Sequence, residues 1–471
     1  MDVDRYRSAV RSVVDGRRVI LAGGSAAYWT GTASQLRALG ATAVMVVGTE
    51  GTGVGPQPSP DDAVVLVEEL AEATGMAAIR GSVAALARPS DALVAALRAF
   101  DPGGDALAIG SFLNEAPDLD GRPFLNHRRP AWVALEDKCA VDALWDRAGV
   151  ARAPSAIAPV RADALRRASD QVDAGDGVVW AADARDGWHG GGELVRRVRT
   201  RRHAYDALAA LAPHADAVRV MPFLRGVPCS IHGIVFPEAV AAVRPIEMVT
   251  LGRPDDHPDA TQFFYAGCAS FYDPPAALRD EMRDVARRVG AALRGEVGFA
   301  GCFTVDGVAT ADGFRPTELN PRLGAGLNVA MRAVPDLPFS IVLDLLVAGL
   351  APEWLDAATL EADLLSVTDA HRAGGTWRAL PAAAPADGSL RYDGTRWELV
   401  DEADHADGTL IAGSGGGGGF VRLSYAADGG VPTGPSTGPV AAAFWRWADE
   451  HLGTAIGPLV PAGGATAPGA R

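Results

Sequence analysis

The chain has 471 residues, of which 48% are hydrophobic and 21% charged, and its formal net charge is −15 at pH 7. This length exceeds a single ordinary core, and the composition is that of a well-packed globular protein rather than a disordered one. The acidic balance excludes nucleic acid as an expected partner, since backbone binding needs a basic face, whereas a nucleotide needs only a local positive pocket.

The chain start and the apolar runs favour a cytoplasmic protein that does not enter a membrane. The start, MDVDRYRSAVRSVVDGRR, is charged throughout and lacks the apolar core of a signal peptide. The apolar run FSIVLDLLVAGL is interrupted by Asp344 and is shorter than the roughly 18 residues of a membrane span. The four cysteines are far apart and show no zinc-site spacing, which is typical of small buried residues in a reducing compartment.

The first 129 residues alternate strand and helix signals. Buried strands are predicted over 17–24, 41–48 and 105–112, and helices over 32–40 and 91–100. Such alternation predicts a parallel, doubly wound sheet with helices on its faces. The glycines of ILAGGSAAY do not form G-x-G-x-x-G, so dinucleotide binding is not expected.

After a Pro-rich connector at 121–130 and a first helix, the sequence predicts a strand, a loop, a helix and a strand in turn. The helix that follows the connector is expected to end at Gly149, because glycine is the common C-cap. The elements expected from here on are a helix over 138–150, a strand over 177–184, a Gly-rich loop, a helix-like segment over 194–212, strands over 217–224 and 230–236, and a β-hairpin over 296–320.

The segment from 351 mixes helix and strand signals. It has a helix-like pattern at 360–367, a hairpin at 389–400, a strand pair around the glycine run 413–419, and a helix over 440–452. No Lys-Ser/Thr follows the glycine run, so a hairpin tip is favoured over a phosphate loop. The tail from about 456 is rich in Pro, Gly and Ala without a period, which predicts disorder.

The stretch TVDGVATADGFRPTELNPRLGAG (304–326) carries the clearest chemistry. Alternation along a strand places Glu318, Asn320 and Arg322 on one face, and cross-strand pairing sets Asp306 beside Glu318 or Asn320. Two carboxylates about 5–7 Å apart repel by roughly 2–3 kcal/mol, which favours a cation between them. Oxygen ligands that include an amide fit Mg²⁺ or Mn²⁺ rather than zinc. Spacing alone leaves a solvent-facing polar strand with a local Arg–Glu pair as the alternative.

An ordered set of motifs over about 130–350 resembles the ATP-grasp superfamily. The set consists of EDK (136–138), the turn AGVARAP, the Gly-rich loop, VRVMPFLRG (218–226), and ELNPR with an Asp twelve residues before its Glu. The resemblance implies an α/β chain with a Rossmann-like pre-ATP-grasp domain (1–129), an ATP-grasp core (130–350) of two α+β lobes that sandwich ATP, and a small α+β C-terminal extension (351–471). A mobile lid lobe is expected at about 151–220.

Within that superfamily, the N-terminal domain, the Gly-rich loop, the run RPIEMVTL and the extension look most like pheganomycin-type peptide ligases. This resemblance implies an ATP- and Mg²⁺-dependent (or Mn²⁺-dependent) ligase that joins a small-molecule carboxylate to an amine or peptide acceptor in specialised metabolism. The carboxylate would pass through an acylphosphate, with release of ADP and phosphate. A homodimer is an open expectation for the assembly.

The resemblance also assigns roles to individual residues. Lys138 and the loop Asp186–Gly192 would contact the phosphates, and Arg322 would steady the transferring phosphate. Arg244 would stabilise an oxyanion or phosphate, with a structural salt bridge to Glu247 as the alternative. The full set is Arg322 and Arg244 in catalysis; Lys138, Arg185, Gly190, Gly191, Gly192, Pro222, Phe223 and Leu224 on ATP; and Asp306, Glu318 and Asn320 on the metal.

Three departures from the family pattern concern the nucleotide. Lys138 is the only lysine among 43 Lys+Arg, and Trp180 stands where many members have a second one, so Arg185 or Arg196 is expected to substitute. Trp180 would either pack in the core or stack on adenine. The hinge glutamate is absent, although adenine recognition needs only the backbone C=O of Pro222 and N–H of Leu224. Pro228 replaces the ribose carboxylate, for which Glu238 is the nearest candidate.

Three other functions stay open on the sequence. The first is a ligase for free amino acids or another small acid. The second is a catalytically silent nucleotide-binding protein, which the missing lysine and hinge glutamate would suit, although the intact metal set Asp306, Glu318 and Asn320 weighs against it. An oxidoreductase is the remaining one.

Overall fold

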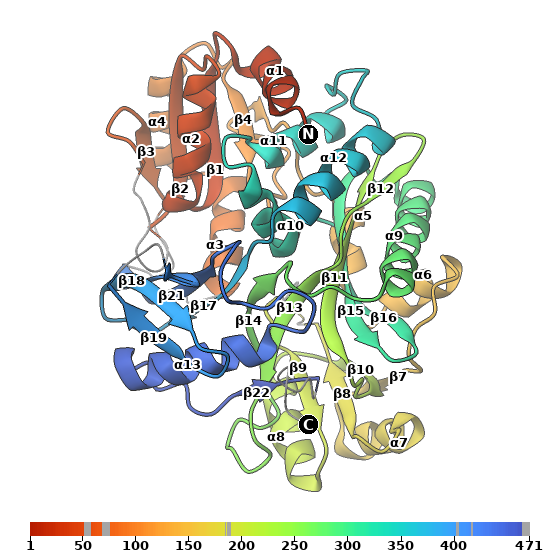
Figure 1. The fold of residues 1–471 in the computed structure, drawn as a ribbon. Coiled ribbons are helices and arrows are strands. Elements are labelled where there is room, and N and C mark those ends of the chain that lie inside the picture. Colours follow the sequence, from red (N-terminus) through yellow and green to blue (C-terminus); the bar gives the residue numbers. More distant parts are fainter. Residues whose placement is uncertain are drawn as a thin grey trace.

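The computed structural model describes residues 1–50, 58–67, 76–183, 185, 190–401, 405–415 and 418–463 (Figure 1). Over these residues the chain has a mixed α/β fold, with a parallel sheet at the N-terminus and antiparallel sheets in the rest. The predicted fold class is therefore confirmed. None of the helices in the described ranges has both the length and the apolar character that a bilayer span needs.

The N-terminal domain is built on a parallel sheet of order β3-β2-β1-β4, as the strand–helix alternation predicts. Its central strand β1 is buried on both faces, with Val19 to Ala22 wholly inaccessible, because helices cover the sheet. Its elements are α1 (Val3–Val14), β1 (Arg18–Ser25), η1 (Ala26–Trp29), α2 (Thr30–Ala38), β2 (Ala43–Thr49), β3 (Ala63–Leu66), α3 (Met76–Ala87), α4 (Asp91–Phe100), β4 (Leu107–Gly110), β5 (Asp118–Leu119) and β6 (Arg122–Pro123).

The segment predicted to be a lid lobe, at about 151–220, is built on an antiparallel sheet of order β7-β10-β8-β9, shown in yellow in Figure 1 and called the lid sheet below. One face of this sheet packs on its two helices around Trp180, Leu165 and Leu211. The other face is turned to the cavity described below. The elements are β7 (Ala156–Pro159), α7 (Ala162–Val172), β8 (Val178–Ala181), β9 (Val195–Val198), α8 (Arg201–Leu211) and β10 (Ala217–Pro222).

The helix predicted over 194–212 is wrong in its first part. Residues 195–198 form β9, which pairs antiparallel with β8 and closes the edge of the lid sheet. The helix begins only after Thr200, whose side chain accepts a hydrogen bond from the His203 N–H as an N-cap. Tertiary pairing of β9 thus outweighs the local helical pattern.

The remaining strands form one antiparallel sheet, which has twelve strands within the described residues. Its main path is β16-β15-β11-β13-β14-β17-β21-β20-β18-β19, with β12 beside β11 and β22 beside β13. The strands are β11 (Val227–Val235), β12 (Val240–Ala242), β13 (Ile246–Gly252), β14 (Phe264–Ala269), β15 (Gly301–Thr310), β16 (Gly313–Asn320), β17 (Gly374–Leu380), β18 (Ala386–Tyr392), β19 (Trp397–Val400), β20 (Gly408–Gly415), β21 (Gly418–Tyr425) and β22 (Val460–Pro461).

Helices cover this large sheet. The long helix α9 packs on β11 and β12 and was not predicted; it also takes up the start of the hairpin expected over 296–320, which begins at Gly301 instead. The helical elements of this part are α5 (Pro130–Val133), η2 (Ala134–Glu136), α6 (Val141–Arg147), α9 (Ala276–Val297), α10 (Ala325–Ala330), η3 (Met331–Ala333), α11 (Phe339–Val347), α12 (Ala357–Ala370) and α13 (Gly438–Leu452).

The C-terminal extension continues the core sheet. Strand β17 pairs with β14 of the core. Helix α13 packs against β17, where the Trp445 ring N–H donates to Thr376 Oγ1 at 2.7 Å. The tail predicted to be disordered from about 456 is ordered up to 463: β22 pairs with β13, and Gly226 N–H donates to the Gly463 carbonyl at 3.3 Å. Residues 464–471 lie outside the described residues.

Candidate active site

The β15–β16 hairpin carries the acidic residues of the site. Asp306 stands opposite Glu318, and Thr304 stands opposite Asn320. The register shifts between Asp306 and Gly307, so that Thr317 is an extra residue on β16. This bulge turns Glu318 to the face of Asp306, and both line one cavity.

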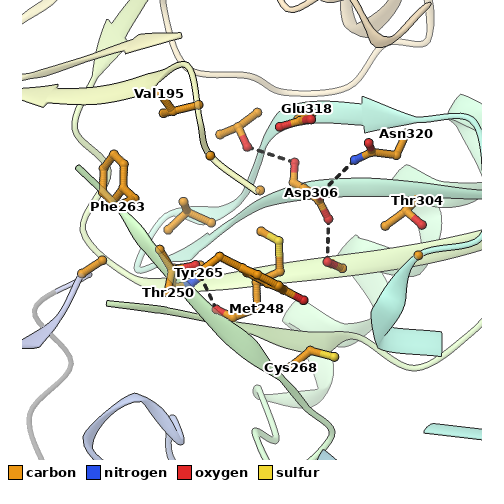
Figure 2. Close-up of a pocket in the computed structure, with 18 of the residues that line it drawn as sticks. Val195, Met248, Thr250, Phe263, Tyr265, Cys268, Thr304, Asp306, Glu318 and Asn320 are labelled. Atoms are coloured by element: carbon orange, nitrogen blue, oxygen red, sulfur yellow. Dashed lines mark hydrogen bonds between the residues drawn. The ribbon is translucent and has the colours of Figure 1, made fainter. Parts of the chain in front are cut away.

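The two carboxylates lie on neighbouring strands in a partly buried stretch of the cavity wall. Burial and the negative charge of Glu318 raise the pKa of Asp306 to about 7. Ser230 Oγ donates to Asp306 Oδ1 at 2.5 Å, and Asn320 Nδ2 donates to Oδ2 at 2.9 Å, as Figure 2 shows for Asn320. A cation placed here would relieve the repulsion between the carboxylates and hold Asp306 ionised.

The residues present fit Mg²⁺ bound mainly through phosphates. Within the described ranges no group of three or more His, Cys, Asp or Glu side chains could hold a metal ion. Mg²⁺ in nucleotide sites commonly takes one or two carboxylates and fills its other positions with phosphates and water. Asp306 and Glu318 meet that need. The Asn320 oxygen accepts from Arg322 at 2.8 Å, so this amide must turn before it can bind a cation.

Lys138 joins the acidic pair from the turn before α6. Its ammonium lies 3.1 Å from Asp183 Oδ1 and 3.3 Å from Glu318 Oε1, and the residue is 5% exposed. Burial lowers the pKa of Lys138, but Glu318 and Asp183 outweigh this effect and raise it above its usual value. The only lysine of the chain is therefore a fixed positive charge beside the predicted metal residues.

Arg322 is held by the same motif that contains Lys138. Its Nε donates to Glu136 Oε1 at 3.0 Å, and Glu136 also pairs with Arg128 at 2.7 Å. Arg322 lines the cavity and keeps 17% of its side chain exposed. The EDK motif thus binds the ELNPR motif twice, through Glu136 to Arg322 and through Lys138 to Glu318.

The cavity has a volume of about 340 Å³, within the usual range for small-molecule sites, and one end of it is apolar. Pro222, Phe223 and Leu224 line this end, where Val179 and Met221 pack with Phe223. The Phe223 N–H donates to the Gly177 carbonyl at 2.9 Å. No acceptor for the Leu224 N–H lies in the part of the chain that the structure describes, so this amide remains available for an adenine edge.

The Gly-rich loop is described in part. Gly190, Gly191 and Gly192 line the cavity, as expected. Gly191 and Gly192 have φ of +63° and +77°, a conformation in which side chains other than glycine are strained. Residues 186–189 of the predicted loop Asp186–Gly192 lie outside the described residues.

Arg185 and Arg244, which were predicted to bind ATP or the reacting groups, lie outside the cavity. Arg185 is bound to the far edge of the lid, where Nε donates to Asp216 at 2.8 Å and Nη1 to the Pro213 carbonyl at 2.9 Å. Arg244 is buried in an ion-pair network with Asp273, at 2.7 Å, and with Asp369. Neither lines the cavity, so the geometry does not support their predicted roles.

The alternatives for these arginines also need correction. Glu247 does not pair with Arg244; its carboxylate accepts from the Thr437 N–H at 2.7 Å and so caps α13. Arg196 donates to the Glu193 and Val195 carbonyls. No cation for a second phosphate contact is therefore identified among the residues predicted for it.

Of the other residues predicted near the nucleotide, Pro228 lines the cavity, whereas Trp180 and Glu238 do not. Trp180 is 2% exposed and donates to Ser169 Oγ at 3.0 Å, so it packs in the lid core and not on adenine. Its neighbour Val179 faces the cavity instead. Pro228 lines the cavity, but Glu238 is exposed in the turn between β11 and β12 and does not.

Several residues of the site were not predicted, among them Ser230, His232 and Asp183. Ser230 and His232 alternate along β11 and face the cavity, and Asp183 holds Lys138. The alternation in CSIHG was a usable signal for the first two, since residues two apart share a face of a strand. Asp183 follows β8 directly, but no pattern in the sequence links it to Lys138 across 45 residues.

No protein-family model and no curated protein matches the chain. Its fold is similar to that of the biotin carboxylase from Campylobacter jejuni, solved as a βγ-ATP complex, with a TM-score of 0.53 and 15% identity over 93% of this chain and 91% of that one. The L-amino acid ligase from Bacillus licheniformis gives a TM-score of 0.50 and 12% identity, over 93% and 98%. Pyruvate carboxylase from Rhizobium etli gives 0.54 and 16%, and the chain spans only 37% of that protein.

These similarities, at 12–16% identity, show the fold. The chain has the ATP-grasp fold: a lid sheet and a large antiparallel sheet with the cavity between them, preceded by a parallel α/β domain. The fold that the ordered motifs imply is therefore confirmed.

Proposed function

We propose that this protein is an ATP- and Mg²⁺-dependent carboxylate–amine ligase that forms a peptide bond and releases ADP and phosphate. The observation that supports it best is the set of Asp306, Glu318, Asn320 and Arg322 in one cavity wall. The Lys138 ammonium does not itself line the cavity but lies 3.3 Å from the Glu318 carboxylate that does. The apolar end of the same cavity suits an adenine ring, and the polar end suits its phosphates.

The proposed chemistry has two steps. A carboxylate oxygen of the acid attacks the γ-phosphorus of ATP, the bond from that phosphorus to the bridging oxygen of ADP breaks, and an acylphosphate forms. The amine then attacks the acyl carbon and loses a proton, and the C–O bond breaks to release phosphate. Bound Mg²⁺ would neutralise charge on the phosphates.

The residues of the cavity would act by position and charge. The Lys138 ammonium, fixed by Asp183, would face the phosphates, and Arg322, fixed by Glu136, would stabilise charge on the transferring group. Glycines 190–192 would let the loop backbone approach the phosphates closely. Such groups reduce the barrier because they are oriented before the reaction starts.

We propose further that the acid and amine belong to specialised metabolism, as in pheganomycin-type peptide ligases. The run RPIEMVTL that supports this resemblance forms β13, from which Met248 and Thr250 line the cavity. A peptide acceptor, rather than a free amino acid, is the partner we favour. A cytoplasmic location would supply the ATP.

A catalytically silent ATP-binding protein is the second candidate, and the position of Arg185 favours it. With Arg185 bound to Asp216, the second phosphate-contacting cation of many relatives has no established substitute. ADP release measured with ATP, Mg²⁺, a panel of amino acids and short peptides, and hydroxylamine as amine separates the two. Hydroxamate formation supports the ligase, and ATP binding without any turnover supports the silent protein.

Glu318→Gln is the variant that tests the site. We expect at least a 100-fold loss of metal-dependent ADP release with the fold intact, because a neutral amide cannot replace a carboxylate on Mg²⁺. Glu296→Gln, which changes a carboxylate paired with Arg147 on the surface, is the matched control. Wild-type activity of Glu318→Gln would contradict the metal assignment.

A further inference from the structure

A fully buried histidine faces the cavity without a partner. His232 is 0% exposed and lines the cavity from β11. Neither Nδ1 nor Nε2 has a hydrogen-bond partner among the described residues. Nearly all buried polar side chains in proteins are hydrogen-bonded, because leaving one unpaired destabilises the fold. An unpaired imidazole aimed into a cavity therefore calls for a ligand.

The position of His232 follows from the strand register. Pro228, Ser230 and His232 face the cavity from alternate positions of β11, and their partners on β15 are Val308, Asp306 and Thr304. Two residues along a strand span about 7 Å. His232 and Thr304 therefore lie about 7 Å beyond the Ser230–Asp306 pair, on the side away from the hinge.

A glycine segment packs against the imidazole ring, where any larger residue would collide with the ring. A Cβ atom at Gly324 would lie 2.8 Å from His232 Nε2, and one at Gly326 would lie 3.0 Å from Cε1. Thr304 Oγ1 donates to the Arg322 carbonyl at 3.2 Å and fixes the start of this segment. The ring thus lies next to the residue expected to steady the transferring phosphate.

The ring is neutral at physiological pH. Burial lowers the pKa of His232 to about 3. A neutral imidazole has one N–H donor and one acceptor nitrogen. A neutral donor in a buried place forms its strongest hydrogen bonds with an anionic oxygen such as that of a carboxylate.

We propose that His232 binds the acid substrate, through a hydrogen bond from its ring N–H to an oxygen of the reacting carboxylate and then of the acylphosphate. This inference rests on the proposed ligase function. In phosphoryl transfer the attacking and leaving oxygens lie in line on opposite sides of the γ-phosphorus. With the adenine at the hinge and the phosphates at Asp306 and Lys138, the attacking carboxylate belongs at the next row, where His232 lies.

The test uses acetonylphosphonate, the stable analogue of acetyl phosphate with CH₂ in place of the bridging oxygen, titrated by calorimetry onto the full chain loaded with MgADP. His232→Leu should weaken acetonylphosphonate binding by about tenfold or more, because it removes the N–H. His232→Gln, which keeps an N–H donor, should lose less. MgADP affinity should be unchanged in both. His203→Gln, at a buried histidine of α8 outside the cavity, is the matched control.

A thermal measurement separates a binding role from a structural one. Since His232→Leu removes an unpaired buried polar group, its unfolding midpoint should equal or exceed that of the wild type while probe binding falls. If His232 had only a structural role, the leucine variant would have a lower unfolding midpoint and unchanged probe binding. Should the leucine variant fail to fold, ring-nitrogen NMR of the ¹⁵N-histidine-labelled wild type replaces it, with His232 assigned as the signal that His232→Gln lacks.

The outcomes are distinct. Equal acetonylphosphonate affinity in the wild type and His232→Leu overturns the inference, as does a His232 ring signal that does not move when the probe binds. Failure of the MgADP-loaded wild type to bind the probe overturns it too. Failure to bind MgADP at all overturns the proposed function, and the inference with it.

Discussion

Lys138 shows at the residue scale why one lysine differs from the 42 arginines of this chain. Its ammonium is buried between Asp183 and Glu318, with Asp306 across the strand from Glu318. One positive charge among three carboxylates leaves the cluster net negative when all are ionised. A compact ammonium fits such a place, and the remaining charge is what a divalent cation would neutralise.

Lys138→Arg should weaken ATP binding by at least about tenfold although the charge is kept. The guanidinium is larger and planar, and a side chain that is 5% exposed has no room to reorient. Calorimetric titration with ATP measures the effect. Arg147→Lys, the reverse exchange at a surface ion pair with Glu296, is the control and should leave the affinity unchanged. Equal ATP affinity in Lys138→Arg and the wild type would contradict a phosphate role.

Arg244→Met should lower the free energy of unfolding by only about 1 kcal/mol, since the two carboxylates that it leaves are partly exposed and each keeps a second arginine, Arg279 or Arg372. The two carboxylates are Asp273 and Asp369. Urea unfolding measures the loss, and ATP affinity of the folded fraction should not change. Full stability together with lost turnover would restore the catalytic role that the sequence suggested.

The β15–β16 hairpin shows at the element scale what a strand pattern can and cannot predict. Pairing Thr310 with Gly313 and counting back from the turn would set Thr317 opposite Asp306 and turn Glu318 to the core face. The bulge at Thr317 shifts the register by one residue and reverses that outcome. Alternation therefore limited the partner of Asp306 to Glu318 or Asn320, and only the bulge decided between them.

Helix α11 carries a partly buried acid, Asp344, that makes stability depend on pH. Asp344 accepts a hydrogen bond from Asn126 at 3.0 Å, and burial raises its pKa to about 7. The folded state then binds a proton that the unfolded state releases near pH 4, so the contribution of Asp344 to stability falls as the pH rises from about 4 to 7.

Asp344→Asn should remove that pH dependence and stabilise the protein at pH 8 by on the order of 2–4 kcal/mol, since one pKa unit is about 1.36 kcal/mol. Urea unfolding at pH 5 and pH 8 measures it. Asp356→Asn, at the N-cap of α12, is the control. Hydrogen bonds from Thr359 lower the pKa of Asp356, so this variant should not remove the loss of stability between pH 5 and pH 8. If the free energy of unfolding changes between pH 5 and pH 8 by the same amount in Asp344→Asn as in the wild type, the raised pKa is contradicted.

The C-terminal segment closes the cavity at the scale of the whole molecule. Ala462 and Gly463 line it, and the Ala462 N–H donates to the Thr250 carbonyl at 3.1 Å. A segment more than 200 residues from Leu224 thus forms part of the cavity wall.

Truncation after Leu459 should weaken ATP binding by about fivefold, which corresponds to the loss of roughly one net hydrogen bond and its packing. Leu459 itself is kept because it is buried in the core below β13. Truncation after Gly463 retains both lining residues and is the matched control. Equal ATP affinity of the two truncated chains would contradict a role of this segment in the site.

The sequence by itself determined the fold class, and it singled out Asp306, Glu318 and Lys138, which the structure brings together, because strand–helix alternation, strand parity and residue chemistry are local properties. Only the tertiary structure decided which charges meet. Arg185 and Arg244 were predicted at the substrate and lie in other ion pairs, while Asp183 and Glu136 were not singled out and hold Lys138 and Arg322. Pairing of charges depends on contacts between residues 45 to 186 positions apart, and no local pattern specifies such contacts.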